Sequence, residues 1–187
     1  MIAGSTRRFL LASARQALAD EIGCGDMVEP VGEAPHDPVL DAPARVFVSW
    51  HVGDRLLGCI GTLQEHETLI SAVRHFAVQS GLHDPRAGAV DAEVLARARV
   101  DVSVLSAPTE LEVVGVQNIE LAIRPFEDGV ILRRMLRRAV FLPVVWQKLP
   151  DRREFIRALA RKAGIDPDRE GDDARASVFG VEAFGEP

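Results

Sequence analysis

Two β-rich runs separated by only two residues restrict how this chain can fold. Residues 45–52 read RVFVSWHV and residues 55–62 read RLLGCIGT, and Gly53 and Asp54 connect them. β-branched, aromatic and leucine side chains favour strands, and a short connection that contains glycine and aspartate is typical of a tight hairpin. The sequence therefore predicts two neighbouring strands that pair antiparallel.

Three helical patterns and several further strands accompany this hairpin. Helices are predicted from Ser5 to the glycine at position 23, over residues 67–81, and from the capping residue Asp151 to Gly164. Strands are predicted over residues 99–105, over the hairpin 129–134 and 137–142, and over residues 176–185. Because hairpins and helices are separate and do not alternate regularly, the pattern predicts an α+β fold with largely antiparallel sheets and about three main helices.

Length and composition favour one compact fold. The chain has 187 residues, of which 47% are hydrophobic and 27% charged, so we expect residues 1–187 to form a single domain. Residues 30–44 contain four prolines and are predicted to be an extended surface segment, because proline continues neither a helix nor a central strand. Residues 166–176, DPDREGDDARA, are predicted to be a polar loop.

Charge and apolar patterning argue against several classes of protein. The net charge of −6 argues against nucleic acid as an obligatory ligand. The basic run RRMLRR at residues 133–138 is interpreted as a solvated hairpin tip, with nucleic-acid binding as the alternative. No apolar run approaches the roughly 20 residues that cross a bilayer, and the N-terminus lacks the apolar core of a targeting signal. We therefore expect a cytoplasmic protein that does not bind a membrane and whose Cys24 and Cys59 are free thiols.

Metal and cofactor motifs are not visible. The histidines and cysteines do not follow metal-ligand spacings such as H-E-x-x-H or C-x-x-C. The sequence also lacks a phosphate-binding loop and a dinucleotide fingerprint. We therefore expect no metal and no cofactor.

Cys59 lies between two glycines of the predicted strand 55–62. Since successive side chains of a strand point to opposite faces, Leu57, Cys59 and Gly61 are expected to share one face, with Gly58 on the other. Glycine inside a strand usually marks a bulge or a place where another group approaches the backbone closely. The approaching group is either a ligand or a helix of the protein itself, and a buried cysteine is often only a small apolar filler.

Five segments resemble, in order, the motifs of the AMMECR domain family. LLGCIGTL (56–63) is similar to the family's LRGCIG, HDPR (83–86) to RDPRF, VDVSVLSAP (100–108) to ISVLSPP, DGVIL (128–132) to DGLIL, and VFLPVVWQKLP (140–150) to TFLPQVWEQLP. Each motif is short, but five motifs in the same order make the resemblance specific.

The resemblance implies an α+β fold with a larger and a smaller lobe and a pocket beside the GCIG strand. The site residues that it implies are Gly58, Cys59, Ile60, Gly61, Asp84, Pro85, Arg86, Pro143 and Trp146. Members of the family are often encoded beside a Memo-like protein and a radical-SAM protein, which implies a shared system. No settled activity comes with the family name.

The chain departs from the family pattern at three positions. Leu57 replaces an arginine, and His83 and Ala87 replace the first arginine and the phenylalanine of RDPRF. A cation beside a thiol favours the thiolate, whereas a leucine on the same face desolvates the thiol and raises its pKa. Arg55, on the predicted face of Cys59, and Arg86 are the residues able to replace the missing cation.

Two hypotheses for the function follow. In the first, the protein is a binding or accessory module for a Memo-like and a radical-SAM partner, and Cys59 only fills space. In the second, it is an enzyme that uses Cys59 as a nucleophile or redox thiol on a small anionic substrate. Arg86 would then hold the anion, and backbone N–H groups of residues 58–61 would receive the developing charge. The leucine at position 57 favours the first hypothesis.

Three further residues each have two interpretations. His51 is expected to be a surface histidine nearer Leu56 than Cys59, with a Cys59/His51 couple as the alternative. Trp146 is expected to pack in the core, with a ligand-pocket wall as the alternative. Asp84 is expected to form an Asx turn around Pro85 and not to contact a substrate.

Overall fold

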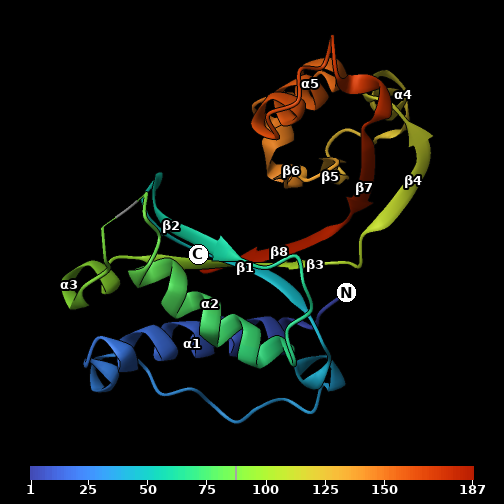
Figure 1. Cartoon of the computed structure of the whole chain (residues 1–187). Helices are drawn as coiled ribbons and strands as arrows, with labels where there is room; N and C mark the ends of the chain where they lie inside the picture. Colours follow the sequence, from blue (N-terminus) through green and yellow to red (C-terminus); the bar gives the residue numbers. More distant parts are fainter. Residues whose placement is uncertain (87) are drawn as a thin grey trace. The chain divides into compact units, whose positions relative to one another are not determined.

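The structure is a computed structural model that describes residues 1–86 and 88–187, and the chain divides into two compact units (Figure 1). The larger unit comprises Met1–Leu105 with Glu182–Pro187, and the smaller unit comprises Ser106–Val181. Each unit contains helices and one four-stranded sheet. The predicted α+β class with antiparallel pairing is therefore confirmed.

A sheet with two long helices on one face makes up the larger unit. The strand order is β2 (Arg55–Gly61), β1 (Arg45–Val52), β3 (Arg99–Leu105) and β8 (Val181–Gly185), and β1 is antiparallel to both β2 and β3. Helices α1 (Gly4–Glu21) and α2 (Leu69–Leu82) lie side by side against this sheet (Figure 1). Alternate residues of β1, namely Val46, Val48 and Trp50, are fully buried and form the centre of this core.

The smaller unit has its own sheet and its own core. The strand order is β4 (Thr109–Val114), β7 (Arg175–Phe179), β5 (Gly129–Arg134) and β6 (Arg137–Phe141), with antiparallel pairing throughout. Helices α4 (Val116–Ala122) and α5 (Arg152–Lys162) and the 3-10 turn η3 (Pro143–Gln147) complete it. Phe155, Ile156 and Leu159 on the apolar face of α5 pack with Ile119 of α4 and Leu132 of β5.

Both predicted hairpins and all three predicted long helices are confirmed. Gly53 and Asp54 connect β1 to β2, and Met135 and Leu136 connect β5 to β6. The side chain of Asp151 accepts the N–H of Glu154 at the start of α5, as the capping pattern predicts. These predictions hold because each depends on residues that are close together in the sequence.

The predicted single strand 176–185 is wrong. The segment forms β7 in the sheet of the smaller unit and β8 in the sheet of the larger unit. Gly180 separates the two strands, and its N–H donates to Oγ of Ser106 over 3.0 Å. Apolar residues flank this glycine on both sides, and the sequence does not reveal that the two halves pair in different sheets. Strand β4 and helix α4 were not predicted.

The predicted helix stop at Gly81 is also wrong. Helix α2 continues to Leu82, and Gly81 is a buried residue inside it. A Cβ atom on Gly81 would lie only 2.7 Å from Cδ2 of Leu18 in α1. The missing side chain therefore permits the close packing of α1 against α2 and does not end the helix.

Two predicted loops contain more structure than expected. In the proline-rich segment 30–44, the 3-10 turn η2 (Pro38–Asp41) begins at Asp37, whose carboxylate accepts the N–H of Val39, and Leu40 in this turn is buried. The polar loop 166–176 contains the 3-10 turn η4 (Gly171–Asp173), and β7 already begins within it. Proline at the first position of η2 has the φ angle that such a turn needs. Two further short elements are η1 (Gly25–Met27) and α3 (Ala92–Leu95).

Candidate functional site

Cys59 lies on β2, an edge strand of the larger unit's sheet. The outer backbone groups of an edge strand have no strand partner. At Cys59 two side chains take that place: the N–H of Cys59 donates to Oδ2 of Asp84 over 2.8 Å, and Nη2 of Arg86 donates to the carbonyl oxygen of Cys59 over 2.8 Å. The GCIG and HDPR motifs are thus in direct contact, and this contact provides hydrogen-bond partners for the outer backbone groups of Cys59 at the edge of the sheet.

Asp84 and Arg86 form a bidentate ion pair. Nε of Arg86 donates to Oδ1 of Asp84 over 2.9 Å, and Nη2 donates to Oδ2 over 2.7 Å. The Asp84 side chain is only 2% exposed, whereas that of Arg86 is 69% exposed. Hydrogen bonds from Arg86 are the main reason that the pKa of Asp84 lies well below its ordinary value. The backbone N–H of Arg86 also donates to Oδ1 of Asp84 over 3.0 Å, so the predicted Asx turn is confirmed.

The two glycines beside Cys59 are packed against the protein's own backbone. A Cβ atom on Gly58 would lie 2.0 Å from the carbonyl oxygen of Ser80 in α2. A Cβ atom on Gly61 would lie 2.2 Å from the carbonyl oxygen of Val46 in β1. The predicted alternatives are close approach by a ligand or by the protein itself, and the structure shows that the protein's own backbone approaches both glycines. Neither glycine therefore needs a ligand to explain it.

A β-bulge at Leu57 alters the predicted faces of β2. Trp50 of β1 pairs with Gly58, and the next residue of β1, His51, pairs with Leu56, so that Leu57 is the extra residue. Leu57 packs in the buried core under the sheet, whereas Cys59 pairs with Ser49, which is not part of that core. The prediction that Leu57 and Cys59 share a face is wrong, because the bulge interrupts the alternation. The pairing of His51 with Leu56 is as predicted.

The thiol of Cys59 is half-buried. Burial raises its pKa above the ordinary value, and the positive charge of Arg86 only partly opposes this effect. Burial therefore favours the neutral thiol over the thiolate. Ile60, the next residue, pairs with Val48 and is itself half-buried.

Polar side chains extend from Cys59 across the sheet. Ser49 of β1 lies opposite both Cys59 of β2 and Asp101 of β3. Nε2 of His51 lies 3.3 Å from Oγ of Ser49 and 3.3 Å from Oδ2 of Asp101. Both contacts use the same ring nitrogen, whereas a Ser-His-Asp catalytic set uses one nitrogen for each partner. Because side chains alternate along a strand, the sequence places Ser49 and His51 on one face of β1. That Asp101 lies beside them depends on the register between β1 and β3, which the sequence does not reveal.

Trp146 lies in the smaller unit and is part of its core. Its ring is fully buried and stacks on that of Phe155, with 3.7 Å between the ring centres and 4° between the planes. Its Nε1–H donates to the carbonyl oxygen of Asp128 over 2.8 Å. Pro143 begins the turn that carries this tryptophan. The core interpretation of Trp146 therefore agrees with the structure better than a pocket wall.

Within residues 1–86 and 88–187, the structure contains neither a group of three His, Cys, Asp or Glu side chains arranged to bind a metal nor a helix long and apolar enough to cross a bilayer. Both cysteines are free thiols, with Cys24 buried in the core. Ala87, where the family motif has phenylalanine, lies outside the described residues.

Comparison with known proteins decides the family. The family model for AMMECR1 matches residues 11–184. The chain belongs to the AMMECR1 family. A protein of Methanothermobacter thermautotrophicus is 35% identical over 96% of this chain and 93% of its own length. The crystal structure of an uncharacterised protein, PH0010 of Pyrococcus horikoshii, superimposes with a TM-score of 0.81 at 30% identity, over 95% of this chain and 90% of that one.

Proposed function

We propose that this AMMECR1 protein is a binding or accessory module that works in the cytoplasm with a Memo-like protein and a radical-SAM protein. The partners come from the family resemblance. The supporting observation is the environment of Cys59, because its N–H and its carbonyl oxygen are occupied by Asp84 and Arg86 while its thiol is held neutral by burial. The family match spans both compact units, which supports treating residues 1–187 as one AMMECR-type domain.

The contacts of Asp84 and Arg86 argue against a catalytic anion site at Cys59 and for recognition of a partner. The N–H of Cys59 already has an acceptor, so it does not offer a free donor to a developing negative charge. The guanidinium of Arg86 is engaged with Asp84 through two nitrogens. The exposed side of the Arg86 guanidinium is the charged part of this cluster that is accessible to a partner protein. A guanidinium fixed by a carboxylate is well suited to recognition, because little conformational entropy remains to be lost on binding.

An enzyme that uses Cys59 as a nucleophile or redox thiol on a small anionic substrate is the second candidate. The observation that favours it is the row of Ser49, His51 and Asp101 beside a thiol that is not fully buried. The two candidates differ in the protonation state of Cys59, and this state is measurable.

Alkylation of Cys59 should be slow at neutral pH. In a Cys24→Ala background, the rate of reaction with iodoacetamide is expected to rise only above the free-thiol pKa of about 8.5, because burial disfavours the thiolate. Replacing Arg86 by alanine should shift the profile further upward, since the charge of Arg86 favours the thiolate. A high rate below pH 7 would instead assign the catalytic role to Cys59. The unfolded protein provides the reference rate.

Direct binding of the partners should not depend on the thiol. Isothermal titration calorimetry with the purified Memo-like and radical-SAM proteins of the same genome is expected to detect binding of at least one of them. Cys59→Ser should change the dissociation constant by less than about threefold, because a space-filling thiol is not an energetic anchor. The accessory role is refuted if neither protein binds.

A further inference from the structure

The tip of the β5–β6 hairpin exposes two large apolar side chains. Met135 is 86% exposed and Leu136 is fully exposed. Met135 also has a φ angle of 52°, a left-handed conformation that non-glycine residues rarely adopt. The positive φ belongs to the two-residue hairpin turn itself, so the exposure of the two apolar side chains is the feature that indicates a contact surface.

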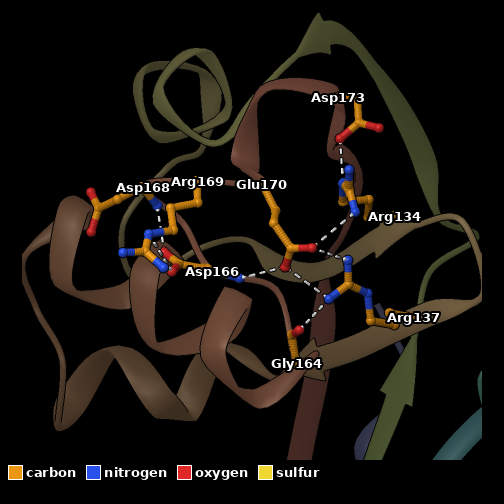
Figure 2. A network of polar contacts seen from close by, with 8 residues as sticks. All are labelled: Arg134, Arg137, Gly164, Asp166, Asp168, Arg169, Glu170 and Asp173. Carbon is orange, nitrogen blue, oxygen red and sulfur yellow. Dashed lines mark hydrogen bonds and ion pairs between the residues drawn. The ribbon is translucent and has the colours of Figure 1, made fainter.

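Ion pairs connect the base of this hairpin to the segment 164–173 (Figure 2). Nη1 of Arg137 donates to Glu170 over 2.9 Å and also to the carbonyl oxygen of Gly164, and Arg134 contacts both Glu170 and Asp173. The pKa of Glu170 is lowered to about 2, chiefly by hydrogen bonds from Arg137, so this carboxylate stays ionised at all physiological pH values. The base of the tip is therefore joined to the neighbouring segment by charged groups.

The same ion pairs reduce the positive charge that the tip offers to phosphates. Arg133 pairs with Glu110 over 2.6 Å, so three of the four arginines of RRMLRR have acidic partners. Arg138, at the start of β6, makes no ion pair within the described part of the chain and is exposed. The hairpin therefore exposes two apolar side chains, with the modest positive charge of Arg138 beside them. This combination fits an apolar hollow with an acidic rim better than a nucleic acid.

The larger unit contains such a hollow. It has a volume of 590 Å³, within the range of about 300–1,000 Å³ that is typical of ligand pockets. Its lining includes the apolar residues Phe9, Pro35, Leu40 and Ile70, the acidic residues Asp37 and Asp41, and His36. Asp37 is fixed in place, because its carboxylate accepts hydrogen bonds from the hydroxyl of Thr6 and from the N–H of Val39.

Charge also differs between the two units. The larger unit has 16 acidic and nine basic residues, whereas the smaller unit has 12 acidic and 13 basic residues. An approach of the hairpin tip of one molecule to the larger unit of another is therefore electrostatically favourable.

We propose that the Met135–Leu136 tip of one molecule inserts into the hollow lined by Phe9, Pro35, Leu40 and Ile70 of a second copy of this chain. The contact is head-to-tail: the molecule that supplies the tip keeps a free hollow, and the molecule that supplies the hollow keeps a free tip, so further molecules add to the assembly. Because two side chains bury little surface, the association is weak. This inference is independent of the proposed Memo-like and radical-SAM partners.

Sedimentation velocity over about 10 µM to about 1 mM protein at low salt tests the inference. The wild type is expected to form larger species as its concentration rises. A tip variant, Met135→Gly with Leu136→Ser, relieves the positive φ and removes both apolar side chains, so it should fold and remain monomeric. A hollow variant, Ala34→Arg, places bulk and positive charge on an exposed residue of the hollow and should also remain monomeric.

Mixing the two variants gives the decisive result. The hollow variant retains its tip and the tip variant retains its hollow, so the mixture should form one-to-one dimers and nothing larger. Leu121→Ser, which removes another exposed leucine, is the matched control and should associate like the wild type. Three outcomes overturn the inference: a wild type that is monomeric up to about 1 mM, a tip variant that still associates, or a mixture without dimers. A monomeric wild type whose tip instead binds phosphatidylserine vesicles would assign the tip to a membrane.

Discussion

Replacing Asp84 by alanine should lower the free energy of unfolding by about 3 kcal/mol, a large effect for a single polar residue. The buried carboxylate accepts hydrogen bonds from the N–H of Cys59 and from three groups of Arg86. Alanine removes all of these acceptors and leaves the N–H of Cys59 without a partner at the closed edge of β2. Urea unfolding of the wild type and the variant measures the difference.

Two companion measurements distinguish the ion pair from simple loss of volume. Asp84→Asn keeps the shape and one acceptor and should cost less than alanine. Arg86→Ala should also destabilise, and the double variant should cost less than the sum of the two single variants because the residues interact directly. Additive effects would show that Asp84 acts without Arg86.

The same pair has a defined pH dependence. The pKa of Asp84 is lower in the folded protein than in the unfolded chain, so its stabilisation is present above the ordinary aspartate pKa of about 3.9 and is lost as the pH falls below that value. The Asp84→Asn variant lacks this group. Its stability should therefore fall less steeply than that of the wild type during acidification.

Replacing Trp146 by alanine should lower the free energy of unfolding of the smaller unit by about 4 kcal/mol. The fully buried indole stacks on Phe155, and its Nε1–H is the donor to the carbonyl oxygen of Asp128. Alanine leaves a cavity in the core against which α5 packs. It also removes the donor of the hydrogen bond to Asp128. Chemical unfolding followed by far-UV circular dichroism measures the change.

Trp146→Phe is the matched control for this prediction. Phenylalanine retains an aromatic ring against Phe155 but loses the hydrogen bond to Asp128, so a smaller loss of about 1–2 kcal/mol is expected. If alanine at position 146 were tolerated with almost no loss of stability, Trp146 would not be a core residue, and the pocket-wall interpretation would regain support.

Local patterns predict the elements whose causes are local. The hairpin of β1 and β2 follows from a two-residue connection, and α5 follows from the cap at Asp151 and its apolar face. Prediction fails where partners are distant in the sequence. Residues 176–185 resemble one apolar strand, but β7 and β8 pair in different sheets. Gly81 resembles a helix stop, but it is required by contact with Leu18 of another helix.

The candidate site divides in the same way. The sequence by itself identified Gly58, Cys59, Gly61, Asp84 and Arg86 as residues that belong together, because they occur in ordered family motifs. It also predicted the Asx turn of Asp84, which involves only neighbouring residues. Only the tertiary structure decided that Asp84 and Arg86 bind the backbone of Cys59, and that a bulge separates Leu57 from the face of the thiol. Hydrogen bonds and strand register between distant segments depend on how the whole chain packs, and no local pattern encodes them.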